Sequence, residues 1–240
     1  MSKQIYLRML GYAVTIPLHI TNTVVMMSSF KGEVMKDPYV KHFSEMQVFF
    51  FTCWTFAFQT VFAAFSLYYD IQTLKNAHTD YKPPKIVDFI RREAFISIIW
   101  PSSILVFLFF WSFFFYDRNL LYPVSIDKAI SKTSNHIMHT AILPIVLWEL
   151  IFYHRSRPKN ALWRLLVTFS IELIYLLTLL YVHNVYGVWV YPIFGKLYGS
   201  QWFPLFFVAT GAVLTLIYNL QWYLYSTVWN SAEKTTKKVL

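Results

Sequence analysis

Long apolar stretches alternate with short polar connectors along almost the whole chain. Each stretch is close to the roughly 20 residues that a helix needs to cross the hydrocarbon core of a bilayer. The stretches are unbroken and do not alternate with a period of two, which argues against the strands of a membrane β-barrel. The pattern therefore predicts an all-α polytopic membrane protein with six transmembrane helices, at residues 5–27, 47–69, 94–115, 136–153, 163–183 and 203–226.

Composition supports this fold class and indicates one domain. Hydrophobic residues make up 57% of the 240 residues, and charged residues only 14%. A soluble domain of this size needs more charged surface than that. No internal repeat or low-complexity tract divides the chain, so we expect a single six-helix transmembrane domain over 1–240, with 228–240 as a short polar tail. The first stretch lacks a small-residue cleavage site, which predicts a retained span and not a signal peptide.

The distribution of Lys and Arg predicts the orientation. With the N-terminus in the cytoplasm, the cytoplasmic segments hold fourteen of the 21 basic residues. The positive-inside bias then places both termini in the cytoplasm. The net charge of +9 reflects this bias and contact with anionic lipid headgroups, and the scattered basic residues do not suggest nucleic acid binding. We expect an integral protein of the endoplasmic reticulum or plasma membrane.

Polar residues of four predicted spans converge at the non-cytoplasmic level. Thr52 lies about five residues, or roughly 8 Å, below the start of the second span. His139 lies at a comparable depth in the fourth span, three residues after His136, while Asp117 and His183 end the third and fifth spans. Ionisable groups inside a membrane usually mark a functional site. We therefore expect a reaction or ligand site that faces the lumenal or extracellular side.

The combination of a hydroxyl and a histidine at one membrane depth points to nucleophilic acyl transfer. The histidine takes the hydroxyl proton, an acyl-enzyme forms, and water then releases the acid. This chemistry needs a hydrogen bond between the Thr52 hydroxyl and a ring nitrogen of His139. It also needs a neutral imidazole, which burial favours.

Structural roles remain open for the same residues. A threonine in a membrane helix commonly bonds the carbonyl one turn before it, and this applies to Thr52. His136 suits a structural role, and Asp117 suits a helix end at headgroup level. Glu149, deeper in the fourth span, is expected to pair with a basic loop residue. The cluster at 189–191 is typical of an interfacial aromatic belt.

Several motifs resemble, in colinear order, the androgen-induced protein/ADTRP family. They are Thr52 with Gln59, Phe110-Trp111, Asp117-Arg118, Tyr122-Pro123, Asn135-His136-x-x-His139-Thr140, Leu143-Pro144, Glu149, and His183-x-x-x-Gly187-x-Trp189-Val190-Tyr191-Pro192. Members of that family are multipass membrane hydrolases of fatty acid esters of hydroxy fatty acids. The resemblance implies the same activity here, with a lipid substrate that enters from the bilayer and with no cofactor or metal.

The resemblance also assigns roles to residues. The family threonine falls on Thr52, the nucleophile, and the family histidine falls on His139, the general base and acid. Thr55 offers a second hydroxyl one turn further on. We expect the groups that support the reaction or stabilise the oxyanion to come from a set of nearby polar residues, namely Asn135, His136, Asp117, His183 and Asn184.

Two other functions fit the sequence. One alternative is a metal or haem protein whose ligands are His136, His139 and His183 on facing helices, although acidic partners are sparse. The other alternative is a lipid-binding or regulatory membrane protein without catalytic activity. Its partners are then the lipids of the membrane.

Overall fold

The computed structural model describes residues 3–79 and 82–239, and within these residues it is built from helices and loops. The helices are α1 (Lys3–Ser29), α2 (Pro38–Glu45), α3 (Phe51–Lys75), α4 (Lys85–Phe89), a π-helical stretch (Ile90–Ile99), α5 (Trp100–Asp117), α6 (Lys132–His139), α7 (Ile142–Phe152), α8 (Ala161–Tyr186), α9 (Pro192–Leu197) and α10 (Trp202–Val239). Four short 3₁₀ turns lie in the connections between them.

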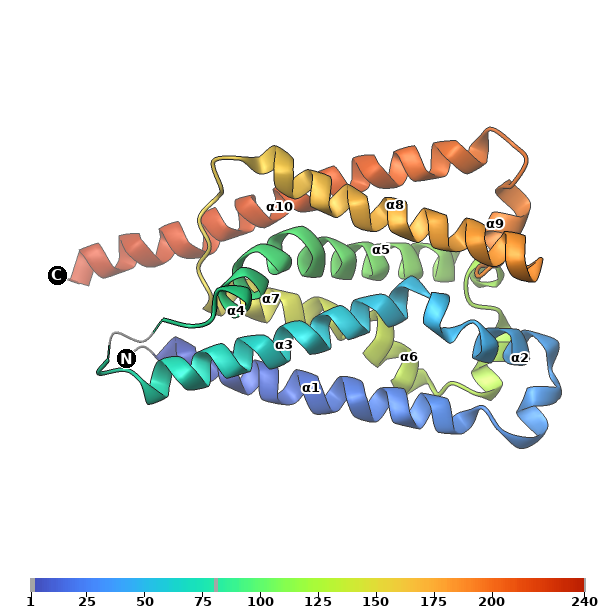
Figure 1. The fold of residues 1–240 in the computed structure, drawn as a ribbon, viewed down its shortest axis with the longest axis horizontal. Helices are drawn as coiled ribbons and strands as arrows, with labels where there is room; N and C mark the ends of the chain where they lie inside the picture. Colours follow the sequence, from blue (N-terminus) through green and yellow to red (C-terminus); the bar gives the residue numbers. More distant parts are fainter. Residues whose placement is uncertain (1–2, 80–81, 240) are drawn as a thin grey trace.

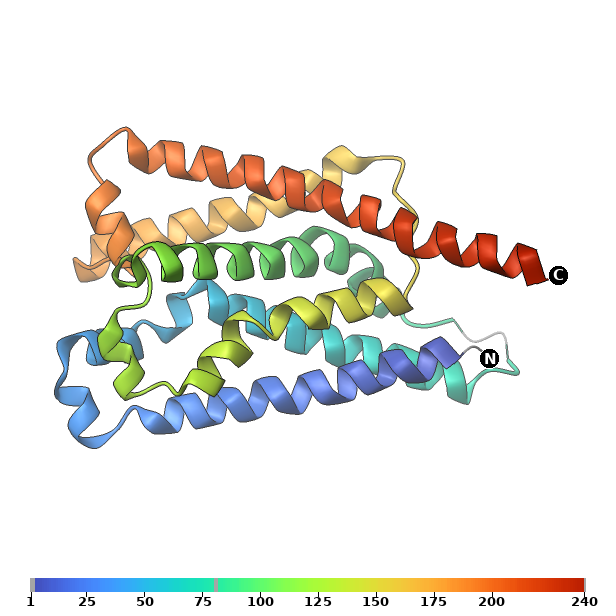
Figure 2. The same ribbon diagram turned by 180° about the vertical axis from the view of Figure 1, so that it is seen from behind.

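The long helices run side by side in one antiparallel bundle (Figures 1 and 2). We call the end where α1 begins and α10 finishes the terminal end, and the opposite end, which carries α2 and α9, the loop end (Figure 1). The helix Lys85–Leu120 lies at the centre of the bundle. Of its most apolar segment 67% is buried inside the protein, against 22% for the corresponding segments of α8 and α10.

The predicted fold class, an all-α polytopic membrane protein, is confirmed. Within residues 3–79 and 82–239, five helices are long and apolar enough to cross a membrane: Lys3–Ser29, Lys85–Leu120, Lys132–Phe152, Ala161–Tyr186 and Trp202–Trp229. The predicted span 47–69 falls on α3, which has 25 residues but is not one of these five. The count of six spans and the cytoplasmic termini stay predictions. The expected polar tail continues α10 as helix to Val239.

The start of α3 differs from the predicted boundary, and the difference changes the position of Thr52. A 3₁₀ turn at Gln47–Phe49 and an extended Phe50 precede the helix. The helix therefore starts at Phe51 and not at residue 47, so Thr52 lies in its first turn and not five residues below its start. The N–H groups of a first turn have no acceptor within their own helix.

The predicted span 136–153 is divided into two helices, α6 and α7, by a break at Thr140 and Ala141. Pro144 explains the break. It has no N–H to offer the carbonyl of Thr140, and its ring would clash with that carbonyl in a regular helix. Thr140 and Ala141 both donate their N–H groups to the carbonyl of His136 instead, at 2.8 and 2.9 Å. His139 consequently stands at the C-terminal end of a short helix inside the bundle.

A buried glutamine connects α3 to three other helices. Gln59 is 1% exposed, and its side-chain oxygen accepts a hydrogen bond from His19 Nε2 of α1 at 2.9 Å. Its amide nitrogen donates to the Ser103 hydroxyl of α5 at 2.8 Å and to the carbonyl of Ile142 in α7 at 3.1 Å. Because hydrocarbon offers no hydrogen-bond partners, these contacts fix α3 against its neighbours.

An ionic network holds the other half of the bundle. Asp70, at the end of α3, accepts hydrogen bonds from Arg8 of α1 at 2.9 and 3.0 Å and from Arg91 at 3.0 Å. Glu149 of α7 pairs with Arg155 of the following loop at 2.6 Å. This pair confirms the expectation that Glu149 bonds a basic loop residue. Asp70 and Arg91 are both 0% exposed, so each charge depends on its partner.

Removal of Asp70 is expected to destabilise the protein strongly. In Asp70→Ala, Arg91 keeps its charge in a buried position without its carboxylate partner, and such a loss typically costs about 3–5 kcal/mol. The apparent melting temperature of the purified protein in detergent should fall by several degrees. Asp88→Ala is the control, because Asp88 and Arg92 form an exposed pair with a 3.7 Å separation whose loss should change little. Equal melting temperatures for the two variants would contradict the role of the network.

Candidate active site

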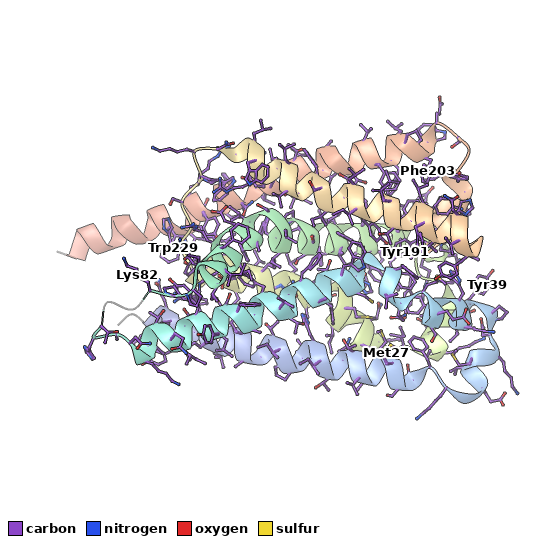
Figure 3. All side chains as sticks on the ribbon, in the orientation of Figure 1. Met27, Tyr39, Lys82, Tyr191, Phe203 and Trp229 are labelled. Carbon is purple, nitrogen blue, oxygen red and sulfur yellow. The ribbon has the colours of Figure 1, made fainter. Side chains whose placement is uncertain are left out.

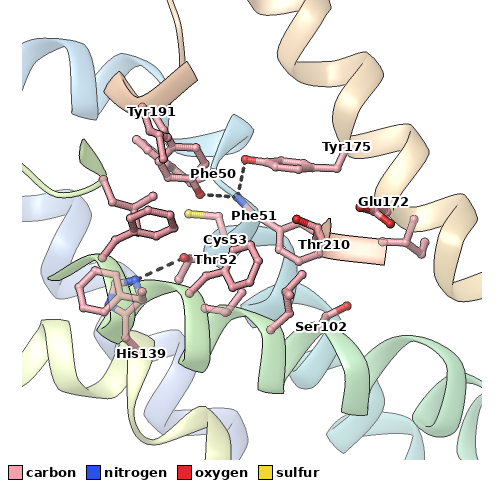
Figure 4. A pocket seen from close by; sticks show the side chains of 18 of the residues that line it. Phe50, Phe51, Thr52, Cys53, Ser102, His139, Glu172, Tyr175, Tyr191 and Thr210 are labelled. Atoms are coloured by element: carbon pink, nitrogen blue, oxygen red, sulfur yellow. Dashed lines mark hydrogen bonds between the residues drawn. The ribbon is translucent and has the colours of Figure 1, made fainter. Parts of the chain in front are cut away.

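The predicted nucleophile and the predicted base are in contact. Thr52 in the first turn of α3 and His139 at the last residue of α6 are 87 positions apart in the chain. The Thr52 hydroxyl oxygen lies 3.3 Å from His139 Nε2, as the dashed line in Figure 4 marks. Catalytic hydrogen bonds are often this long before substrate binds. Two residues that the sequence paired thus lie within hydrogen-bond distance of each other.

The imidazole of His139 is fixed on its other edge by Asn135. His139 Nδ1 lies 2.8 Å from the side-chain oxygen and 3.1 Å from the backbone carbonyl of Asn135. A backbone carbonyl can only accept a hydrogen bond, so Nδ1 carries the proton. In the neutral ring Nε2 is then the acceptor that faces Thr52. The ring also stacks on Phe110, with centroids 3.4 Å apart and planes 6° from parallel.

An apolar cavity of about 120 Å³ opens beside this pair. It is bounded by α3, α5, α8 and α10, and its walls are mostly aromatic and aliphatic, including Phe109, Ile171, Phe206 and Leu214. Figure 4 shows Thr52 and His139 on one side of the cavity, and Ser102, Glu172 and Thr210 on the other. The space suits a hydrocarbon chain with its reacting group at Thr52.

The distant part of the cavity contains a carboxyl group that the sequence reasoning did not single out. Glu172 of α8 lines the cavity, and its Oε1 is buried without a hydrogen-bond partner among the described residues. Its Oε2 lies against Gly211 of α10, where an added Cβ would be only 3.4 Å away. The available signal was an acidic residue in the middle of an apolar span, which is a functional candidate on physical grounds.

A loop tyrosine also reaches the site. α8 ends at Gly187, whose positive φ of +70° is strained for any other residue, and the chain then turns back towards the bundle. Tyr191 in this turn lines the cavity, and its hydroxyl accepts a hydrogen bond from the Phe51 N–H at 3.2 Å. Figure 3 places Tyr191 towards the loop end of the bundle. An interfacial belt, as the sequence suggested for this residue, does not describe its buried hydroxyl.

None of the five predicted supporting residues lines this cavity, and only Asn135 contacts His139 through a hydrogen bond. His136 bonds the Thr140 hydroxyl and stacks on Trp111. Asp117 accepts the N–H of Asn119, as expected for a helix end. The remaining two are His183, which stacks on Trp189 with centroids 4.2 Å apart, and Asn184, which is exposed. Any part these four residues take in the chemistry stays a prediction.

Thr55, the second hydroxyl considered as nucleophile, lies outside the cavity. Thr55 is 0% exposed, does not line the cavity, and donates its hydroxyl to the carbonyl of Phe51 at 3.0 Å. It therefore makes the helix-internal bond that was considered for Thr52.

Across residues 3–79 and 82–239, no group of three His, Cys, Asp or Glu side chains is arranged to hold one metal ion.

These features define a multipass helical membrane protein with a buried Thr–His–Asn arrangement at the edge of an apolar cavity. The chain belongs to the FAR-17a/AIG1-like protein family, whose model matches residues 16–226. This match confirms the resemblance drawn from the motifs.

Known relatives agree with this assignment. The chain is 33% identical to the human androgen-dependent TFPI-regulating protein over 177 residues, which cover 72% of this chain and 76% of that protein. It is 35% identical to the rat protein of the same name over 116 residues, or 48% and 50% of the two chains. It is 32% identical to the human androgen-induced gene 1 protein over 135 residues, or 56% of each. No solved structure matches the chain.

Proposed function

We propose that this protein is an intramembrane hydrolase of lipid esters, with fatty acid esters of hydroxy fatty acids as its substrates. The observation that carries the proposal is the contact between the Thr52 hydroxyl and His139 Nε2, with Nδ1 held by Asn135, beside an apolar cavity. The substrate class comes from the family resemblance. The cavity suits an acyl chain, and a lipid would enter it sideways from the bilayer.

The reaction follows from the positions of these groups. His139 Nε2 takes the proton as the Thr52 oxygen attacks the ester carbonyl carbon, and the carbonyl π electrons move to oxygen. When this tetrahedral intermediate collapses, the bond to the hydroxy fatty acid breaks and His139 protonates the leaving oxygen. Water then attacks the acyl-Thr52 ester with His139 as base, and the released fatty acid leaves Thr52 with its proton restored.

The proposed orientation places the site on the lumenal or extracellular side of the endoplasmic reticulum or plasma membrane. Thr52, which contacts His139, lies in the first turn of α3, and this helix begins towards the loop end, opposite to both described chain ends (Figure 1). If the termini are cytoplasmic, as the basic residues predict, this end faces away from the cytoplasm. A shallow position suits the reaction, because the chain needs hydrocarbon while deacylation needs water.

Substitution of the pair tests the proposal directly. Thr52→Ala and His139→Ala should each lower hydrolysis by at least about 100-fold, because the nucleophile or its base is lost. The assay measures acids released from a fatty acid ester of a hydroxy fatty acid by mass spectrometry, with purified protein at matched concentration. Thr55→Ala is the control and should stay close to wild type, while Thr52→Ser should keep part of the activity.

Two outcomes would contradict parts of this proposal. If wild-type protein turns over neither this ester nor simpler lipid esters, the hydrolase function is wrong, and a bound lipid recovered from the cavity would support a lipid-binding protein. If Thr55→Ala is inactive and Thr52→Ala is active, the nucleophile lies one turn further along α3.

The cavity predicts a dependence on acyl chain length. Thr210 is 6% exposed and lines the part of the cavity distant from Thr52. Thr210→Phe should fill that part and lower the hydrolysis of long acyl chains relative to short ones. Val208→Phe is the control on the same helix, because Val208 is 69% exposed and faces away from the core. Short-chain activity reports that each variant is folded. An unchanged ratio in Thr210→Phe would show that the acyl chain does not occupy this cavity.

A further inference from the structure

Two tyrosine hydroxyls meet at the start of α3, directly before Thr52. The N–H of Phe51 donates to the hydroxyl of Tyr175 from α8 and to the hydroxyl of Tyr191 from the loop after α8, both at 3.2 Å. Figure 4 shows both hydroxyls converging on this nitrogen. Both tyrosines also line the cavity that contains Thr52. The reacting carbonyl would therefore lie beside one or both of them.

The hydroxyl protons distinguish the two tyrosines. A phenol has one proton to donate, and it can accept other hydrogen bonds. Tyr175 donates its proton to the backbone carbonyl of Phe49 at 3.1 Å, so that proton is already used. The Tyr191 hydroxyl faces the hydroxyls of Tyr175 and Thr52, and a phenol or alcohol oxygen is a weaker acceptor than an oxyanion. The Tyr191 proton is thus available to a substrate bound at Thr52.

Tyr191 is also held in place and stays protonated. Its ring packs edge-on against Phe50, with centroids 5.2 Å apart, and against Phe194 of α9 at 6.0 Å. Burial raises the pKa of Tyr191 to about 12, so the phenol keeps its proton at neutral pH. A donor that is already oriented needs no reorganisation as charge develops in the transition state.

From this geometry we infer that the Tyr191 hydroxyl is a catalytic residue, the hydrogen-bond donor that stabilises the oxyanion formed when Thr52 attacks an ester. This inference rests on the proposed hydrolase function. The proton stays on the Tyr191 oxygen and bonds the negative oxygen of the tetrahedral intermediate, whose electrons return to the carbonyl when the leaving group departs. The positive end of the α3 dipole, at its first turn, adds to this stabilisation.

A matched pair of variants tests the inference. Tyr191→Phe and Tyr175→Phe each remove one hydroxyl from the same Phe51 N–H, but only the first removes the available proton. Tyr191→Phe should lower kcat by about 10²–10³-fold with little change in KM, as expected for the loss of one oxyanion donor. Tyr175→Phe should lower kcat less than Tyr191→Phe does. Tyr181→Phe is the control on α8, because Tyr181 is 52% exposed and does not line the cavity, and it should stay close to wild type. Melting temperatures report whether each variant is folded.

Binding of a trifluoromethyl ketone analogue of the ester separates a donor from a structural group. The ketone forms a hemiketal oxyanion on Thr52, so Tyr191→Phe should weaken its binding by a factor similar to the loss in kcat/KM. The corresponding ether, which forms no oxyanion, should bind both proteins alike. Equal losses for the ketone and the ether would contradict the inference.

A second variant covers the case in which Tyr191→Phe does not fold. A ring-fluorinated tyrosine at position 191 keeps the hydroxyl but makes it more acidic. Its kcat should fall as pH rises through the range where this phenol ionises, while wild type stays level there. An unchanged profile would overturn the inference.

The activities of the variants distinguish failure of this inference from failure of the proposed function. If wild type is active, Thr52→Ala is inactive and Tyr191→Phe equals wild type, only the role of Tyr191 is wrong. If wild type is inactive, the hydrolase function itself fails.

Discussion

The three hydrogen bonds of Gln59 determine the relative positions of the helices that carry the site. Gln59 lies seven residues, or about two turns, after Thr52 on α3, and its partner Ile142 lies three residues after His139. The bond between them therefore sets how far α3 slides along the α6–α7 segment, and so whether Thr52 meets His139. In an apolar interior a lost amide partner is costly, so this register is strongly specified.

Polar contacts at both ends of α3 complete this constraint. Asp70 binds Arg8 and Arg91 near the terminal end, and Thr52 meets His139 towards the loop end. Helix α3 thus carries buried polar residues along its whole length, among them Gln59, Ser66 and Asp70. Buried ion pairs contribute little net stability, but the loss of one partner is expensive, so they select one arrangement over alternatives.

The sequence predicts the helices and the Thr52–His139 pair better than it predicts the rest of the site. Hydropathy and residue counts predict how deep a residue lies in the membrane. They do not predict which neighbouring helix its side chain faces, because successive side chains are rotated by about 100° around the helix axis. Asp117 and His183 lie at the ends of their helices, but they contact Asn119 and Trp189 and do not line the cavity. Thr52 and His139 were first paired by their depth, and the motif resemblance then assigned their roles, because a family motif identifies residues that share a site without any knowledge of their rotation around the helix. The pairing of Glu149 was easier to predict from the sequence, because its partner Arg155 is only six residues away.

Features that depend on long-range packing were not readable. Pro144 was visible in the sequence, but a proline can either kink a helix or end it, and here the helix ends at His139 because Thr140 and Ala141 both bond the carbonyl of His136. Tyr191 follows a helix of 26 residues and reaches α3 because Gly187 turns the chain back. A residue in an aromatic cluster after a span gives the same sequence signal whether it faces lipid headgroups or a cavity.

The site is built from helix ends, and the physics of a membrane interior explains why. The middle of a membrane helix has its backbone groups paired, so it can offer a substrate only side chains. The start of α3, the end of α6 and the turn after α8 supply backbone groups that bond side chains, a helix dipole and polar side chains at one level. The cavity then continues between the middle parts of α5, α8 and α10, whose lining is mostly apolar apart from Ser102, Glu172 and Thr210. An ester whose carbonyl lies at the helix ends and whose chain lies between the helices matches both environments, and this match supports the proposed restriction of the substrate to lipid esters.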